Sequence, residues 1–439
     1  MRIRGPGFYF FLFISVIQSV LAAHVPYVIS GAGPAGLTAA LELLDAGANP
    51  EDVLVVEARS FEKYATRPRA ILLEDQSVEQ LARLRVNVPG STFKKFRFIH
   101  KENEYIFYNN GVMKDSLLKA VLSRRVNKIV LIGELEKSLL KEYQRRGGRI
   151  SFGTTLSEEI SYKYLFVAEG TRSKTREKLG IRFDEIYPER APYYIGTDYV
   201  LDHSEEEAKG TLYFDKDGKW VGYEAAGGNG GSIGVWTETP VDLEDPDIKE
   251  KHRARIEKIL ADSGTYPDSF QDPYLFNGKL YQANKIRIGN VFLIGDALRA
   301  SNPEAGNGLN TALKDASAVG SFYTVHRYSE KLAEYKLENT LRQNSHMTLN
   351  RSVQFRNLVE WIANRPTGAE KALQFGHTIG SFEDEKNKFR ALEYVPSFLL
   401  LKAMRLALKK AGVPLLEKDA KDSINLSDIH ADCGQLLKR

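Results

Sequence analysis

The sequence predicts an α/β fold: a Rossmann-like nucleotide-binding domain with an inserted β-sheet and a helical C-terminal region. Three observations lead to this prediction. Apolar runs with strand-like and helix-like spacing alternate from His24 to Glu57 around a glycine-rich turn. Short β-like segments dominate residues 193–239, and helical spacing returns after Tyr335. The 43% hydrophobic and 27% charged content is typical of a globular protein.

The length of 439 residues favours two linked subdomains, because a single hydrophobic core seldom extends over so long a chain. Composition shifts divide the sequence into five segments. We predict a leader at 1–23, the first part of the nucleotide-binding domain at 24–182, a β-rich substrate domain at 183–285, the second part of the nucleotide-binding domain at 286–335, and a helical region at 336–439.

Charge and cysteine content exclude several classes of function. The formal net charge is only +4, which gives no electrostatic basis for nucleic acid as a partner. Cys433 is the single cysteine, so the chain has neither an internal disulfide nor a cysteine redox pair. The eight histidines show no metal-binding spacing. Any redox chemistry therefore depends on a bound cofactor.

The first 23 residues have the character of a targeting segment. Arg2 and Arg4 precede an almost wholly apolar run from Phe8 to Ala22, which is short for a membrane span. This pattern predicts a secretory signal peptide or an N-terminal anchor, and hence export or membrane attachment. The alternative is a cytoplasmic enzyme whose leader has no targeting role.

The turn after the first strand has the spacing of a dinucleotide-binding motif. Gly31 permits the tight turn, Gly33 permits close approach of a pyrophosphate, and Gly36 permits close packing of helix on strand. The helix N-terminus offers free N–H groups to phosphate. The second strand ends at Glu57, 21 residues after Gly36, where a carboxylate can accept hydrogen bonds from ribose hydroxyls. The predicted contacts here are Gly31, Gly33, Ala35, Gly36, Glu57 and Ala58.

Three later segments are the basis of a family resemblance, which implies further candidate cofactor contacts. Arg69 lies in the segment Arg67–Leu73, for which a solvated basic loop before an amphipathic helix is the favoured interpretation when the segment is taken on its own. The strand-like run Leu165–Ala168 leads into Glu169 and Gly170. The third segment, from Val291 to Ala316, is the most specific because a buried strand delivers an acid and two glycines to one loop before a helix. Its candidates are Gly295, Asp296, Pro303, Gly306, Gly308, Leu309 and Asn310.

In this order the segments resemble the class A flavoprotein monooxygenases, the para-hydroxybenzoate hydroxylase type. The resemblance covers roughly Val25 to Tyr335 and implies FAD as the cofactor. It implies that Arg69 contacts the flavin, that Asp296 binds the ribityl chain, and that the segment Pro303–Gly308 lies beside the isoalloxazine ring.

Two positions depart from the family pattern. Glu169 stands where the family has aspartate, so charge is kept but reach changes. Gly133 stands at or near a position where many members carry arginine or glutamine, which leaves one flavin contact unassigned.

The β-rich region corresponds in the resembled family to a sheet that covers the substrate site. We predict strands at 193–201, 211–215, 219–226 and 232–238, with turns at Asp217-Gly218 and at Gly227–Gly231. Its aromatic side chains either line the substrate pocket or form cross-strand packing pairs, and packing is the favoured interpretation for each one. They are Tyr194, Tyr199, Tyr213, Trp220, Tyr223 and Trp236.

The resemblance implies a monooxygenase that reduces FAD with NADPH or NADH and inserts one oxygen atom of O₂ into an organic substrate. Two alternatives remain: a flavin-dependent reductase or dehydrogenase on the same fold, and a flavin-bearing protein-interaction module. The substrate, the catalytic residues and the choice of nicotinamide do not follow from the sequence. The leader and a basic amphipathic stretch at Pro396–Lys410 suggest contact with a membrane.

Overall fold

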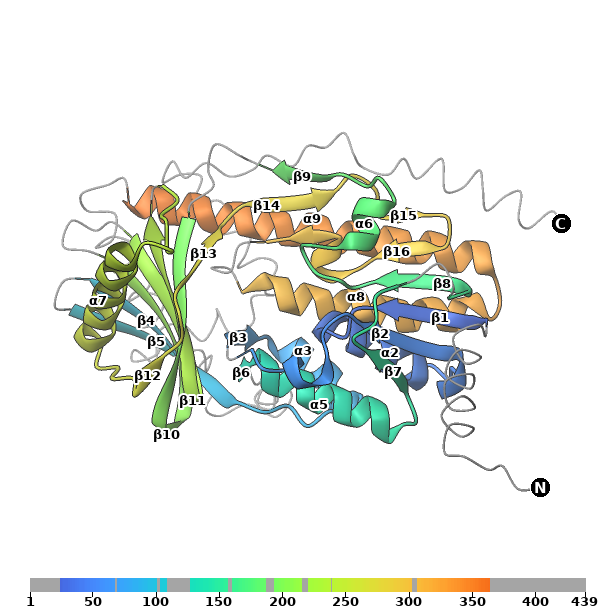
Figure 1. Cartoon of the computed structure of the whole chain (residues 1–439), viewed down its shortest axis with the longest axis horizontal. Coiled ribbons are helices and arrows are strands. Elements are labelled where there is room, and N and C mark those ends of the chain that lie inside the picture. Colours follow the sequence, from blue (N-terminus) through green and yellow to red (C-terminus); the bar gives the residue numbers. More distant parts are fainter. Residues whose placement is uncertain are drawn as a thin grey trace, which may run out of the picture.

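The computed structural model describes residues 24–363, apart from 68, 101–102, 109–126, 157–159, 187–192, 215–219, 238 and 302–305. Within this part the chain forms an α/β body at one end and a curved sheet at the other (Figure 1). The predicted leader and the basic stretch Pro396–Lys410 lie outside the described residues. Among the described helices, none has the length and apolar character of a membrane crossing.

A six-stranded sheet forms the centre of the α/β body. Across the sheet its strands are β15 (Arg287–Ile288), β16 (Val291–Leu293), β8 (Tyr162–Val167), β1 (Val25–Ser30), β2 (Val53–Glu57) and β7 (Arg149–Phe152). Neighbouring strands are parallel except for the antiparallel pair β15 and β16. Parallel strands are buried on both faces, which explains their nearly continuous apolar sequences.

Helices cover this sheet. They are α2 (Pro34–Asp45), α3 (Asp75–Arg83), α5 (Ile132–Arg145), α6 (Lys174–Lys178), α8 (Asn307–His326) and α9 (Glu330–Ala363). The helix α2 packs against both α5 and α8, and α9 runs back along α8 (Figure 1). The helix α8 begins within the third predicted motif, and its N-terminus lies at the end of the body that faces the second sheet (Figure 1).

The second sheet has eight strands. They are β3 (Ala70–Leu73), β4 (Ser91–His100), β5 (Asn103–Tyr108), β6 (Lys128–Leu131), β10 (Tyr193–Phe214), β11 (Trp220–Thr237), β12 (Ser269–Phe270) and β13 (Tyr274–Asn277). The sheet therefore extends beyond 183–285, the range predicted for the β-rich domain, because β3 to β6 come from within 24–182. The helix α7 (Pro246–Asp262) packs on it, and its buried Ile256 and Leu260 belong to the core of the sheet.

The predicted turn at Gly227–Gly231 is wrong. These glycines lie inside β11, which pairs with β10 on both sides of them. The register shifts opposite this segment, and Gly228 adopts a φ of +66°, so the glycines form an irregular, bulged bend within a long hairpin. The other predicted turn, at Asp217 and Gly218, lies outside the described residues, between two strands that pair antiparallel.

The described residues also form a small three-stranded sheet. It consists of β9 (Phe183–Ile186), β14 (Leu280–Ala283) and β17 (Arg299–Ala300). The strand β14 pairs with both others in antiparallel fashion, so it joins the chain leaving β8 to the chain that returns after β16.

Candidate flavin site

The glycine-rich turn between β1 and α2 has the geometry that a dinucleotide requires. Gly31 has a φ of +104°, which favours glycine, and a Cβ there would lie 2.4 Å from the Ala168 carbonyl oxygen. A Cβ on Gly36 would lie 1.9 Å from the Gly31 carbonyl oxygen, so helix and strand meet too closely for a side chain. A Cβ on Gly33 would meet no atom within 4 Å.

The N-terminus of α2 is open toward this space. Pro34 occupies the first helical turn, and no described side chain caps the helix. The N–H groups of the first turn, which include those of Ala35 and Gly36, therefore remain available to an anion. Open space at Gly33 together with uncapped N–H groups fits a pyrophosphate.

Glu57, at the end of β2, is almost fully buried and already saturated with hydrogen bonds. Its Oε2 accepts from the Ala32 N–H at 2.8 Å and from Arg59 Nη2 at 3.2 Å. Its Oε1 accepts from the N–H and the Nε of Arg59, both at 2.9 Å. Burial alone raises the pKa of Glu57, but these hydrogen bonds outweigh it and lower the pKa. A carboxylate offers about four acceptor positions, so a ribose hydroxyl reaches Glu57 only if Arg59 releases one.

Arg59 belongs to a small polar network that sequence reasoning did not find. Its Nη2 also lies 3.4 Å from Oε1 of the fully buried Glu136, which pairs with Arg67 as well. The Tyr64 hydroxyl donates to the Ala32 carbonyl at 2.8 Å and so fastens the network to the glycine turn. The sequence signal that could have indicated this network is the position of Arg59, only two residues after Glu57.

Gly133 has no room for the arginine or glutamine that many members of the resembled family carry at or near this position. A Cβ there would lie 2.6 Å from the Ala65 carbonyl oxygen and 2.8 Å from that of Arg67. The Gly133 N–H donates to the same Arg67 carbonyl at 2.9 Å. The start of α5 thus packs directly on the loop that carries Arg67, and glycine is required at this contact.

Glu169 connects the ends of two elements. Its carboxylate accepts hydrogen bonds from the Ser30 hydroxyl at 2.5 Å, the Ser173 hydroxyl at 2.7 Å, and the N–H and hydroxyl of Thr175 at 2.9 and 2.5 Å. Burial opposes ionisation, but the four donors outweigh it, so the pKa of Glu169 is lowered. The longer side chain therefore ties β1 to the start of α6. A Cβ on the adjacent Gly170, at a φ of +76°, would meet only open space.

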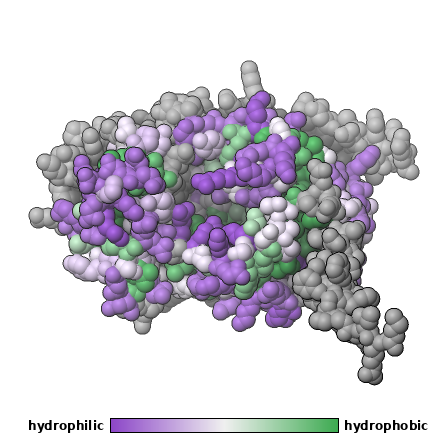
Figure 2. Space-filling model, in the orientation of Figure 1, coloured by the Kyte–Doolittle hydropathy of each residue, from purple (hydrophilic) through white to green (hydrophobic). Residues whose placement is uncertain are grey.

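Asp296 lies in the short turn Gly295–Ala297 that follows β16. Its side chain is exposed to solvent, yet burial raises its pKa above the ordinary value. Both observations hold if protein surrounds the carboxylate on most sides while solvent still enters. On one face of the molecule, Figure 2 shows a hollow near the centre. A Cβ on Gly308 would lie 3.9 Å from Asp296 Oδ1 and 3.4 Å from Ser301 Oγ, which has no hydrogen-bond partner among the described residues.

A buried ion pair holds the turn that carries Asp296. Asp315 on α8 is fully buried, and its Oδ2 accepts from the Gly295 N–H at 2.9 Å and from Arg299 Nη2 at 2.7 Å. Its Oδ1 accepts from Asn344 Nδ2 at 2.9 Å. Gly295 itself has a φ of +58°. The helix α8 therefore fixes the turn through Asp315.

The first turn of α8 begins one residue after Gly306, so Gly308, Leu309 and Asn310 are helical. Gly306 has a φ of +60°, and Leu309 is buried in the main core. The Asn310 side chain accepts from the Glu74 N–H and donates to the carbonyls of Leu72 and Gly306, all at 2.9 Å. Asn310 thus clamps α8 to β3. Pro303 lies outside the described residues.

Arg69 lies at the eight-stranded sheet. It immediately precedes β3, is exposed, and places its guanidinium 4.6 Å from the ring centre of Tyr274 on β13. The structure thus brings the glycine turn, Asp296 and the start of α8 together at the α/β body. It places Arg69 beside Tyr274, at the eight-stranded sheet.

The aromatic residues of the second sheet divide between its faces. The hydroxyls of Tyr199 and Tyr213 donate to the buried Glu224 at 2.5 and 2.6 Å, within the core that packs on α7, so both are packing residues. Tyr194 and Tyr223 pack edge to face with each other. Trp236 is half-buried on β11. The surroundings of the Trp220 side chain lie outside the described part.

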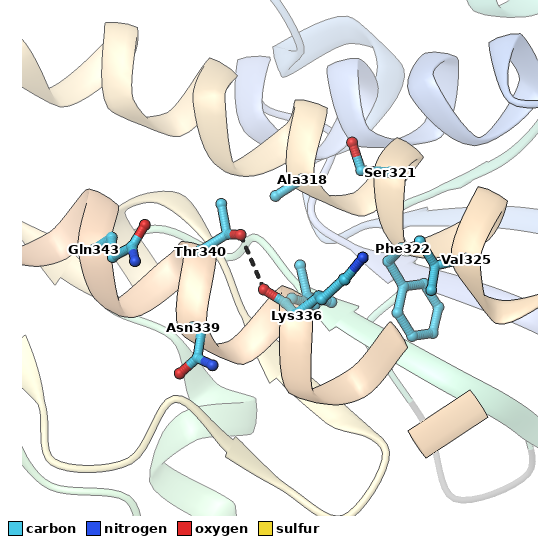
Figure 3. A pocket seen from close by; sticks show the side chains of 9 residues that line it. Ala318, Ser321, Phe322, Val325, Lys336, Asn339, Thr340 and Gln343 are labelled. Atoms are coloured by element: carbon cyan, nitrogen blue, oxygen red, sulfur yellow. Dashed lines mark hydrogen bonds between the residues drawn. The ribbon is translucent and has the colours of Figure 1, made fainter. Parts of the chain in front are cut away.

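A separate cavity of about 310 Å³ opens between α8 and α9 (Figure 3). It begins at Ala318, twelve residues after Gly306, which places it about 18 Å along the helix from the start of α8. This cavity therefore lies apart from Asp296 and the start of α8. It is lined by Ala318, Ser321, Phe322, Val325, Lys336, Leu337, Asn339, Thr340 and Gln343.

Comparison with known proteins identifies the family. The family model for an FAD binding domain matches residues 24–345. The chain belongs to this family. Its predicted fold class and its predicted membership of the class A FAD-dependent monooxygenases are confirmed, and FAD is the cofactor of the matching domain.

Among similar proteins, 6-hydroxy-3-succinoylpyridine 3-monooxygenase HspB of Pseudomonas putida is 28% identical over 323 residues, which cover 67% of this chain and 78% of that protein. The 6-methylpretetramide 4-monooxygenase of Streptomyces rimosus is 27% identical over 186 residues, but these span only 39% of this chain and 29% of that enzyme. The crystal structure of p-nitrophenol 4-monooxygenase PnpA from Pseudomonas putida superposes with a TM-score of 0.62 at 16% identity, over 84% of this chain and 99% of that one. These monooxygenases support the predicted FAD-dependent oxidoreductase function.

Proposed function

We propose that this chain is an FAD-dependent monooxygenase that inserts one oxygen atom of O₂ into a small aromatic substrate. The observation that carries the proposal is the convergence of the open glycine turn, the accessible Asp296 and the uncapped start of α8 at one end of an FAD binding domain. The names of HspB and PnpA give a hydroxypyridine and a nitrophenol as substrates of those proteins, which favours an aromatic ring.

Each part of the chain has a defined task in this proposal. The N–H groups at the start of α2 bind the pyrophosphate, Glu57 binds the ribose once Arg59 yields, and Asp296 binds the ribityl chain. The N-terminus of α8 stabilises negative charge on the reduced ring through its partial positive charge. Bound FAD would accept a hydride from NADPH or NADH and activate O₂. The overall reaction converts substrate–H, O₂, NAD(P)H and a proton into substrate–OH, NAD(P)⁺ and water.

The eight-stranded sheet covers the substrate and keeps water away from it. Supporting this role, β3 of the sheet is tied to α8 of the α/β body, because the Asn310 side chain donates to the Leu72 carbonyl at 2.9 Å. The electron donor and the individual cofactor contacts are parts of this proposal. Export or anchoring by residues 1–23 stays a prediction, because that segment lies outside the described residues.

The test is incubation of the flavin-loaded protein with NADPH, ¹⁸O₂ and a set of phenols and hydroxypyridines, followed by mass spectrometry. One ¹⁸O atom in a product supports the proposal. Reduction of a substrate double bond without ¹⁸O would instead show the predicted alternative, a flavin-dependent reductase. A flavin that no reduced nicotinamide bleaches would favour the other alternative, a protein-interaction module.

A further inference from the structure

One face of the eight-stranded sheet carries a polar cluster that the proposed cofactor contacts do not explain. Asp198 on β10 is paired in register with Ser232 on β11, and the Ser232 hydroxyl donates to Asp198 Oδ1 at 2.5 Å. Arg69, Tyr223 and Tyr274 lie close enough to influence one another's charge or that of Asp198. Two phenols, a carboxylate and a guanidinium therefore converge at one place.

This cluster lies on the face of the sheet opposite to α7. Side chains alternate between the two faces of a strand. Ile195 and Tyr199 on β10 belong to the core that packs on α7, and Asp198 is out of phase with both. On β11 the same argument separates Ser232 from the buried Ile233. The cluster thus faces away from the helix.

A hydrogen bond joins this face of the sheet to the start of β3. The Ser232 hydroxyl accepts from the Ala70 N–H at 2.7 Å, so the cluster contacts the strand that follows Arg69. Three residues from Arg69, Leu72 lies beside Gly306, where a Cβ on that glycine would meet it at 3.8 Å. At about 3.3 Å per residue, the cluster lies roughly 10 Å from the start of α8. The cluster and the start of α8 therefore contact the same strand, β3.

Within the cluster, the Asp198 carboxylate retains a free acceptor. The side chain is 94% buried, since its exposed fraction is 6%. Its Oδ2 makes no hydrogen bond to any residue in the described part of the chain, while Ser232 fixes Oδ1. Burial is the main cause of the raised pKa of Asp198, and it outweighs the hydrogen bond from Ser232 and the charge of Arg69. The oriented carboxylate therefore lacks the donors that would compensate for its burial.

The charges around Asp198 determine which kind of substrate group can bind to its Oδ2. The Arg69 guanidinium is solvent-exposed and stacked on Tyr274, so solvent screens its attraction for an anion. A carboxylate brought to Oδ2 would meet a buried like charge at short range, where repulsion is much stronger than across water. An O–H or N–H donor at the same place would instead form a charge-assisted hydrogen bond.

We propose that Asp198 determines substrate specificity: its Oδ2 accepts a hydrogen bond from a hydroxyl or amine of the aromatic substrate, and it excludes substrates that present a carboxylate there. This inference rests on the proposed function and deepens it. Tyr223 and Tyr274 supply the aromatic walls, since both remain partly exposed on this face. Ser232 acts as a positioning residue because it fixes the carboxylate without reaching the substrate.

The test compares two probes that share one aromatic ring system, 1-naphthol and 1-naphthoate, by calorimetric titration of the full-length, flavin-loaded protein at pH 8. We expect 1-naphthol to bind at least tenfold more tightly, as a hydrogen bond to a charged acceptor warrants. Asp198→Asn removes the charge at nearly constant shape, so the preference should shrink at least tenfold. Asp272→Asn, an exposed carboxylate in the same sheet region that pairs with Lys249, is the matched control and should leave the preference unchanged.

Equal affinity for the two probes, or an unchanged preference in Asp198→Asn, would overturn the inference. If the variant does not fold, the preference of the unmodified protein decides alone, because its absence contradicts the proposal. NADPH bleaching of the flavin is recorded in the same preparation. Bleaching without the naphthol preference contradicts only this inference, whereas the preference without bleaching contradicts the proposed function and supports the subsite.

Discussion

Replacement of Gly36 by alanine should lower the stability of the protein, whereas the same replacement at Gly33 should leave the stability almost unchanged. In Gly36→Ala the new Cβ would stand 1.9 Å from the Gly31 carbonyl oxygen, whereas Cβ contacts in proteins stay above 3.0 Å. Strand β1 and helix α2 must therefore separate by about 1 Å, and such overpacking typically costs about 1–3 kcal/mol of unfolding free energy. In Gly33→Ala the Cβ enters open space, and the backbone at φ −67° and ψ 179° suits alanine. Its stability should change by less than about 0.5 kcal/mol.

FAD affinity should separate the two variants again. The methyl group of Gly33→Ala occupies the space we assign to the pyrophosphate, so the dissociation constant for FAD should rise at least tenfold, which is about 1.4 kcal/mol. Urea unfolding followed by circular dichroism measures the stability, and quenching of flavin fluorescence measures the affinity. The reasoning is refuted if Gly33→Ala binds FAD as tightly as the unmodified protein, or if Gly36→Ala unfolds at the same urea concentration.

Three further substitutions test the packing that supports the site. Asp315→Asn leaves Arg299 buried without its counter-charge, and should lower the unfolding free energy by about 3–5 kcal/mol in urea titrations; a loss under 1 kcal/mol would contradict the buried pair. Because the pKa of Glu169 is lowered in the folded protein, its contribution to stability is present above its ordinary value of 4.5 and is lost as pH falls below it. The stability difference between the unmodified protein and Glu169→Gln should therefore shrink from pH 6 to pH 3, and a constant difference would contradict this. Asp245→Ala removes the acceptor for the Asp247 N–H at the start of α7 and should cost about 1 kcal/mol, measured in the same way; no change would show that the cap is unimportant.

Local patterns were sufficient to predict the nucleotide-binding part of the fold. The spacing of Gly31, Gly33 and Gly36 reflects constraints that act within a few residues. In the structure a Cβ would clash with backbone atoms at Gly31 and Gly36, and would meet open space at Gly33. The acid-ended strand and the helix after Gly306 follow from the same kind of signal. Family resemblance added the identity of the cofactor, which the spacing alone did not give.

Long-range contacts were the part that the sequence did not reveal. The strand β4 pairs in parallel with β10 more than a hundred residues later, so nothing local showed that 91–100 belongs to the second sheet. The four glycines within 227–231 indicated a flexible backbone, but in the structure they form a bend within β11 and not a chain reversal. Likewise, the saturation of Glu57 by Arg59 depends on a side-chain conformation that spacing cannot specify.

The most direct test of the central claim is anaerobic mixing of NADPH with the flavin-loaded protein lacking residues 1–23, followed through the visible flavin absorbance. The account predicts a yellow protein with about one FAD per chain, whose absorbance bleaches on mixing and returns when O₂ is admitted. A protein that acquires no flavin band when incubated with FAD would contradict the assignment of the glycine turn, Asp296 and the start of α8 as one cofactor site.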